Sequence, residues 1–138
     1  KDVDEALAAV GLADHAEAYP PDLSLGQRKL VTVARALARR PKMLLLDEPA
    51  AGLDSGESLE LGKELKQLQD RGITIFLVDH DMDLVLGVCD YINVLEFGKL
   101  IAAGTPAEIR ADDRVIHAYL GVEDESGEWH EVDEEAGA

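Results

Sequence analysis

Met43-Leu44-Leu45-Leu46-Asp47-Glu48-Pro49 is the stretch that decides the fold of this 138-residue chain. The apolar run is typical of a strand that is buried on both faces of a parallel sheet, and two adjacent carboxylates follow it. In open α/β sheets, ligands bind in the crevice beyond the carboxyl ends of the strands. We therefore expect an α/β fold in which Asp47 and Glu48 face a ligand.

A second strand is predicted over residues 73–78, where β-branched and apolar residues run without interruption. This run suits a central parallel strand, and Asp79, His80 and Asp81 follow at its carboxyl end. Asp81 is placed to cap a helix through Val88. The pattern predicts that Asp47, Glu48 and His80 converge at neighbouring strand ends.

Ser24 and Gln27 match a capping box at the start of an amphipathic helix that ends before Pro41. The free backbone N–H groups of such a helix start attract anions, and Gly26 allows close approach of the backbone. This segment could therefore grip a γ-phosphate. The alternative is that Ser24 and Gln27 only cap the helix.

The remaining elements are predicted from local signals. A short helix over residues 3–10 ends at Gly11, and a longer one runs from an Asp54 cap, with Glu57 in the reciprocal position, to Asp70. A β-hairpin turns at Phe97-Gly98 between strands 91–96 and 99–103. Closing helices begin at the Thr105-Pro106-Ala107-Glu108 capping box.

The charge pattern separates a folded domain from a tail. The net charge is −16, and half of it comes from the eight acidic residues of segment 123–138. That segment is predicted to be a disordered acidic tail after a folded domain over residues 1–122, with an acidic interaction tail as the alternative. An acidic chain repels phosphate backbones, so nucleic acid is not an expected partner.

The sequence predicts no direct insertion into a membrane. The apolar runs are far shorter than the roughly 20 residues that span a bilayer, and the N-terminus lacks a signal sequence, so a membrane link must go through a partner. The single Cys89 excludes an internal disulfide, and its apolar neighbours predict a buried thiol.

Hydrolysis of a nucleoside triphosphate needs a metal, a group that orients water and donors that stabilise the transferred phosphoryl group. Asp47 matches a Mg²⁺ ligand, Glu48 can polarise the attacking water, and His80 can direct a ring nitrogen at a phosphate. Asp47 and Glu48 as a turn cap and a purely structural His80 are the alternatives. A metal site built from Asp79, His80, Asp81 and Asp83 is disfavoured because the four are too closely spaced.

A phosphate-binding loop of the form G-x-x-x-x-G-K-[ST] does not occur in this sequence. The carboxylates therefore predict half of an ATPase site, with the loop outside these residues. We interpret the chain as a C-terminal fragment.

With these motifs in order, residues 3–121 resemble the nucleotide-binding subunits of ATP-binding cassette (ABC) transporters. Leu23-Ser24-Leu25-Gly26-Gln27 resembles the ABC signature, although Leu25 stands where Gly is commonest. Residues 44–48 resemble Walker B, residues 51–54 the D-loop and His80 the switch histidine. The resemblance implies a partial P-loop NTPase-like parallel sheet flanked by helices, with a C-terminal hairpin and short helices.

Within this family, residues 48–53, 79–82 and 104–109, together with Ala118-Tyr119-Leu120-Gly121, resemble the ATPases of branched-chain amino acid importers. The resemblance implies a head-to-tail dimer with a second ATPase subunit, bound to transmembrane permease subunits at the cytoplasmic face of the membrane. It also implies a role for each candidate residue. Ser24, Gly26 and Gln27 would contact ATP held by the other subunit, and Asp54 would lie at the D-loop interface. Asp47 would bind Mg²⁺, Glu48 would activate the water, and His80 would contact the γ-phosphate.

The same resemblance predicts what this chain does alone. The P-loop, the adenine-stacking aromatic residue and the Q-loop have no counterpart here, so we expect little or no ATP hydrolysis by the isolated chain. Open strand edges predict that the isolated chain dimerises, rearranges or is only marginally stable in solution. A non-transport ABC ATPase and a binding or regulatory module without a P-loop are the alternative functions.

Overall fold

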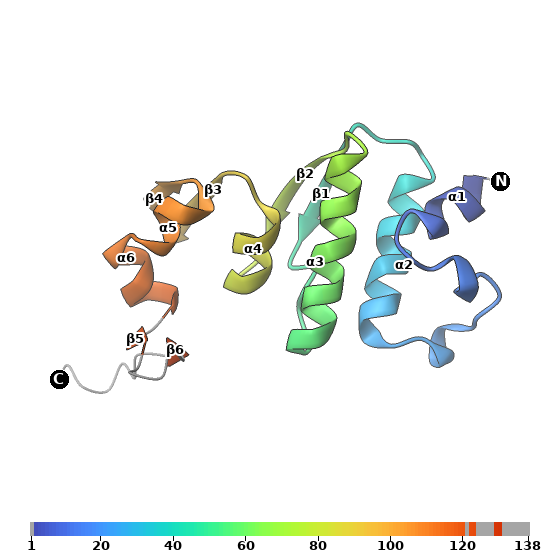
Figure 1. Cartoon of the computed structure of the whole chain (residues 1–138), viewed down its shortest axis with the longest axis horizontal. Helices are drawn as coiled ribbons and strands as arrows, with labels where there is room; N and C mark the ends of the chain where they lie inside the picture. Colours follow the sequence, from blue (N-terminus) through green and yellow to red (C-terminus); the bar gives the residue numbers. More distant parts are fainter. Residues whose placement is uncertain (1, 121, 124–128, 131–138) are drawn as a thin grey trace. The chain divides into compact units, whose positions relative to one another are not determined.

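The computed structural model describes residues 2–120, 122–123 and 129–130, and it divides the chain into two compact units, Lys1–Val88 and Cys89–Ala138 (Figure 1). The first unit carries two short 3₁₀ turns, Ala13–His15 and Pro20–Asp22. Its helices and strands are α1 Asp2–Ala8, α2 Leu25–Leu37, β1 Met43–Asp47, α3 Ser55–Asp70, β2 Thr74–Val78 and α4 Met82–Val88.

The sheet of the first unit is formed by β1 and β2, which pair in parallel from Met43 opposite Thr74 to Asp47 opposite Val78. Alternate residues of both strands, such as Leu44 and Leu77, face a core formed with the helices. Figure 1 shows α3 beside β1 and β2, with α2 next to α3. The strands therefore end at the same edge, as the sequence predicts.

The prediction that β1 is buried on both faces, with residues 73–78 as a central strand, is wrong for this chain. The sheet has two strands among the described residues, and one of its faces is open. Leu45 is 73% exposed and Phe76 is 59% exposed on that face, where Met43 and Val78 are exposed as well. The helices of this chain cover only the other face, so only the strand residues that point to that face, such as Leu44 and Leu77, are packed into the core.

The core of the first unit is built around α3. Leu61, Leu65 and Leu68 are almost completely buried at the helical spacing of an apolar face. Glu64 lies on the same helix and is buried too, and this burial raises the pKa of its carboxyl group. Helices α2 and α4 both pack against α3, so α3 is the central helix of this unit.

The capping predictions hold for α2 and fail in one detail for α3. Ser24 and Gln27 form the complete capping box of α2, and Asp54 accepts a hydrogen bond from the Glu57 N–H at 2.8 Å. The Glu57 carboxylate lies near enough to the Asp54 N–H for that group to help lower the carboxylate's pKa, but the two residues do not form a complete capping box. The carboxylate accepts from the backbone N–H of Gly26 at 3.1 Å, because α2 and α3 begin close together.

The second unit contains the predicted hairpin. Strands β3 Ile92–Glu96 and β4 Lys99–Gly104 are antiparallel and turn at Phe97 and Gly98, both of which have positive φ. This geometry matches a two-residue hairpin turn. Helix α5 Pro106–Arg110 starts with the predicted Thr105 capping box, and α6 Asp113–Val115 continues into a π-helical turn, Ile116–Leu120.

The predicted acidic tail falls largely outside the described residues. Its described part contributes to two short strands, β5 Val122–Glu123 and β6 Trp129–His130, which pair with each other. The prediction of disorder did not include this pairing.

The environment of Cys89 also differs from the prediction, because this residue is only partly buried.

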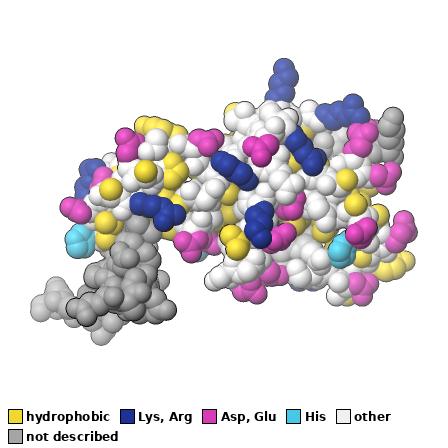
Figure 2. Space-filling view, in the orientation of Figure 1, with side chains coloured by type: hydrophobic (Ala, Val, Ile, Leu, Met, Phe, Trp, Pro, Cys, Tyr) yellow, Lys and Arg dark blue, Asp and Glu magenta, His cyan; other side chains and the backbone are white. Residues whose placement is uncertain are grey.

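No helix within the described ranges combines the length and apolarity needed to cross a bilayer. On the face drawn in Figure 2, Lys and Arg side chains lie interspersed with Asp and Glu side chains.

Candidate active site

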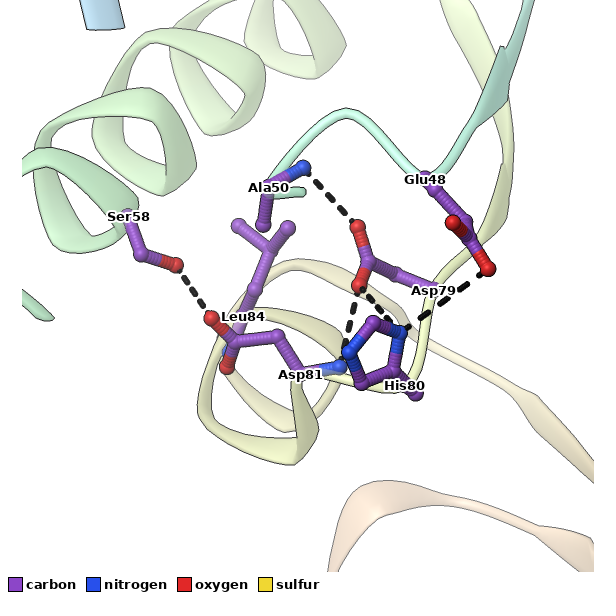
Figure 3. Close-up of polar contacts among 7 residues, drawn as sticks. All are labelled: Glu48, Ala50, Ser58, Asp79, His80, Asp81 and Leu84. Carbon is purple, nitrogen blue, oxygen red and sulfur yellow. Dashed lines mark hydrogen bonds and ion pairs between the residues drawn. The ribbon is translucent and has the colours of Figure 1, made fainter. Parts of the chain in front are cut away.

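Two candidate residues meet at the ends of β1 and β2. The His80 Nδ1 atom lies 3.9 Å from Glu48 Oε1, and both side chains are exposed, by 73% and 59% respectively (Figure 3). Glu48 follows β1 in a left-handed backbone conformation, with φ of 45°, and its N–H donates to the Val78 carbonyl at 2.7 Å. An accessible carboxylate and an imidazole thus face each other at one edge of the sheet.

Asp47 occupies the last position of β1, directly before Glu48, and is exposed. The strand alternation places it on the open face of the sheet, on the same side as Leu45. No group of three or more His, Cys, Asp or Glu side chains forms a metal site in the described part of the chain. An exposed single carboxylate fits Mg²⁺, which is usually held by one or two carboxylates with phosphates and water.

Asp79 directly follows β2, and its side chain is fully buried with 0% exposure. Its Oδ2 atom accepts from the Ala50 N–H at 2.9 Å, and its Oδ1 atom accepts from the Asp81 N–H at 3.0 Å (Figure 3). The Oδ1 atom is also 3.7 Å from His80 Nδ1. Asp79 is not among the site residues predicted from the sequence, although its place directly before His80 was a signal for a role in aiming the ring.

Asp81 has a different task. Its side chain accepts from the Leu84 N–H at 3.0 Å and from the Ser58 hydroxyl at 2.6 Å. The first bond caps α4 as the sequence predicts, and the second joins α4 to α3 (Figure 3). Asp81 therefore fixes helices, whereas Asp79 fixes the turns of the site.

The second cluster of candidate residues lies at the start of α2. The Ser24 hydroxyl accepts from the Gln27 N–H at 3.2 Å, and the Gln27 carboxamide accepts from the Ser24 N–H at 2.9 Å. Gln27 Nε2 lies 3.1 Å from His15 Nε2, a contact that sequence reasoning missed because His15 belongs to a separate turn. The predicted cap is confirmed, and the hydroxyl remains exposed.

A carboxylate already occupies the anion-attracting end of α2. The Gly26 N–H, followed by the Ser24 hydroxyl, lowers the pKa of Glu57. A Cβ atom on residue 26 would lie 3.3 Å from the Glu57 Cβ atom, so this close approach favours glycine there. The two donors thus show affinity for an anionic oxygen, although sequence reasoning assigned Glu57 to Asp54.

Asp54 lies next to this cluster as the exposed cap of α3. Gly52, in the preceding turn, approaches the Leu25 side chain, so the segments of the two motifs are neighbours. Among the described residues, no hydrogen bond joins this cluster to Glu48 or His80. The structure therefore brings the candidate residues together in two groups rather than one.

Comparison with known proteins identifies the family. Residues 1–51 match the family described as "ABC transporter", and residues 99–125 match "Branched-chain amino acid ATP-binding cassette transporter". The chain belongs to the ABC transporter ATP-binding family. Both matched segments overlap the stretch, residues 3–121, whose motifs predicted this family.

This ABC chain is 42% identical over 116 residues to the high-affinity branched-chain amino acid transport ATP-binding protein LivG of Salmonella typhimurium. The match covers 83% of the chain and 46% of LivG. It is 44% identical over 108 residues to the methionine import ATP-binding protein MetN of Pasteurella multocida, covering 78% of the chain and 31% of MetN. The ABC chain thus spans less than half the length of these curated relatives.

Solved ABC structures show the same fold. The ATP-binding cassette MJ1267 in its ADP conformation superposes with a TM-score of 0.76 at 31% identity, over 86% of this chain and 48% of that one. The cbiO1 protein of Clostridium perfringens, part of the ABC transporter complex cbiONQ, gives a TM-score of 0.74 at 38% identity, over 85% and 47%. The predicted ABC-type α/β fold is confirmed.

Proposed function

We propose that this chain is part of the ATP-hydrolysing subunit of an ABC importer for amino acids, most specifically branched-chain amino acids. The observation that carries the proposal is the approach of Glu48 and His80 to 3.9 Å at adjacent strand ends. Family membership supports ATP as the substrate. The P-loop needed for a complete site would come from a part of the protein outside these residues.

In this proposal Glu48 is the group that polarises the attacking water, because its carboxylate is exposed and sits at the end of a fixed strand. The His80 side chain faces Glu48 and is accessible to a phosphate. Its imidazole would contact the γ-phosphate and stabilise the transferred phosphoryl group. In this proposal Glu48 acts on the attacking water and His80 acts on the phosphate.

Asp47 would hold Mg²⁺, since it offers an exposed carboxylate immediately before Glu48. The ion, when bound, neutralises the phosphate charge during transfer. Asp47 ends β1 on the open face of the sheet, where its carboxylate is accessible to an ion.

Ser24, Gly26 and Gln27 would contact ATP held by a second ATPase subunit, and Asp54 would lie at the interface between the subunits. The affinity of the Ser24 and Gly26 donors for the Glu57 carboxylate supports an anionic ligand at this position. The Gly26 N–H can reach a phosphate only if it gives up Glu57. We therefore expect nucleotide binding to rearrange this contact.

The substrate proposal rests on the C-terminal segment. Residues 99–125 match the branched-chain transporter family, and LivG shares 42% identity with this chain. The similarity to MetN extends the possible cargo to other amino acids. As a subunit of such an importer, the protein would bind transmembrane permeases peripherally at the cytoplasmic face of the membrane.

The activity is tested with the complete protein that contains this chain. We expect Mg²⁺-dependent ATP hydrolysis, and Glu48→Gln should lower kcat by about 10²- to 10⁴-fold because the water loses its base. Glu60→Gln is the matched control, since Glu60 is an exposed carboxylate on α3 that pairs with Lys63. Equal rates in the two variants would refute the role of Glu48.

Two further measurements separate the alternatives. The 138-residue chain alone should show little or no turnover, and normal turnover would refute the need for a separate P-loop. Reconstitution with its permease subunits should give ATP-dependent uptake of leucine in preference to methionine. ATP hydrolysis without uptake of either would favour a non-transport ABC ATPase.

A further inference from the structure

The most constrained polar group near the candidate site is the Asp79 carboxylate. It is fully buried, and it accepts two hydrogen bonds from backbone N–H groups that lie outside the strands. One comes from Ala50, in the turn after β1, and the other from Asp81, in the turn after β2. A buried carboxylate needs such partners, and charge-assisted bonds of this kind are short and directional.

These bonds join the two segments that carry the proposed catalytic side chains. Ala50 is two residues after Glu48, and Asp81 directly follows His80. Figure 3 shows the Asp79 carboxylate between these turns, with the His80 ring beside it. The Oδ1 atom that accepts from Asp81 also lies 3.7 Å from His80 Nδ1, so the same carboxylate borders the imidazole.

We propose that Asp79 is a positioning residue that sets the separation of Glu48 and His80 by clamping the turn after β1 to the turn after β2. This inference rests on the proposed function for its effect on ATP hydrolysis, but the clamp itself is a property of the chain. The exposed Glu48 and His80 side chains are not held in place by burial. Their spacing depends on the turns below them, which Asp79 connects.

The carboxylate also sets the orientation of the ring. Nδ1 of His80 faces two carboxylate oxygens, one from Asp79 and one from Glu48. Such neighbours favour the tautomer with hydrogen on Nδ1, and this leaves Nε2 as the free acceptor. Removing the Asp79 charge should therefore change the tautomer balance of His80.

The same substitution, Asp to Asn, at positions 79 and 81 on either side of His80 provides the test. Asp79→Asn places an NH₂ group against a backbone N–H, because both Asp79 partners are donors, and one buried N–H loses its acceptor. In Asp81→Asn the amide can accept from the Leu84 N–H and donate to the Ser58 hydroxyl. Asn is also a good helix cap, which makes Asp81→Asn the matched control.

We would measure kcat and KM for ATP in the complete protein and the ¹⁵N spectrum of His80 in the 138-residue chain, assigned with a His80→Gln variant. Asp79→Asn should lower kcat by about tenfold to a hundredfold, as a displaced catalytic group does, and should change the His80 tautomer signal. Asp81→Asn should leave both unchanged. Asp79→Ser, which keeps one acceptor, replaces Asp79→Asn if that variant does not fold.

An unchanged His80 spectrum in Asp79→Asn would overturn the proposal. A loss of kcat equal to that of Asp81→Asn would overturn it as well, because a general structural defect would then explain both. If the unsubstituted complete protein shows no ATPase activity, the proposed function fails, and the His80 spectrum alone decides whether Asp79 positions the ring.

Discussion

Glu57 hydrogen-bonds to a residue that is distant in the sequence, Gly26, and not mainly to Asp54, the nearby partner that the capping pattern predicts. Its N–H donates to Asp54, whereas its carboxylate reaches Gly26, 31 residues away in the sequence. The backbone N–H of Gly26 is the main cause of the lowered pKa of Glu57. The ionised carboxylate thus links the starts of α2 and α3 and complements the positive end of α2.

The pH dependence of stability should report this contact. Because folding lowers the pKa of Glu57, its stabilising effect is fully present above the unfolded pKa of about 4.3 and is lost as the pH falls through the folded pKa. We expect Glu57→Gln to melt at a lower temperature than the parent chain at pH 7. The difference should shrink below about pH 4 in thermal denaturation.

Glu17→Gln is the control, since it makes the same charge change at an exposed residue between the two 3₁₀ turns. Its melting temperature should track the parent chain at every pH. A gap between Glu57→Gln and the parent that stays constant from pH 7 to pH 3 would contradict the contribution of the ionised carboxylate.

At the scale of the element, the start of α2 combines two tasks. The capping box satisfies the backbone of the helix through the Ser24 oxygen, and the Ser24 hydroxyl proton, which now serves the Glu57 carboxylate, can turn to a ligand when Glu57 moves away. Capping and phosphate binding are therefore compatible. A substitution can separate them only if it keeps the cap and removes the hydroxyl.

Ser24→Asn meets this condition, because Asn caps helices about as well as Ser. We expect Ser24→Ala to lower the stability of the chain by about 1 kcal/mol, and Ser24→Asn to leave it nearly unchanged, in urea denaturation. If Ser24 also contacts ATP, both variants of the complete protein should lose ATPase activity. Full activity in Ser24→Asn would show that this residue is only a helix cap.

At the scale of the whole molecule, the open face of the β1–β2 sheet is the most prominent feature of the first unit. Leu45 and Phe76 are opposite each other in the strand register, and both are exposed. Apolar strands with open edges are prone to pair with other chains. The isolated chain should therefore associate with itself.

Analytical ultracentrifugation of the chain alone should show a population of oligomers that increases with concentration. The double variant Leu45→Thr/Phe76→Thr should reduce it, because threonine suits strands but removes most of the apolar surface. Phe97→Ser is the control, since Phe97 is also apolar and is even more exposed, at 96%, but lies in the β3–β4 turn. A parent chain that stays monomeric at high concentration would count against this prediction.

Local rules account for much of what could be predicted. The caps at Ser24, Asp54 and Thr105 and the turn at Phe97-Gly98 depend on groups within a few residues of each other, and the structure contains all of them. The Glu48–His80 approach was also predictable, because parallel strands end at a common edge. Their catalytic roles remain predictions for the experiments above.

The sequence by itself determined the order of the elements, their caps and the strand ends at which charged groups gather. Only the tertiary structure decided that Glu57 turns to Gly26, that Asp79 bridges two turns and that Leu45 faces outward. The physical reason is distance along the chain. Caps and turns are settled by neighbouring residues, whereas these three outcomes depend on which distant segment, if any, packs against the side chain.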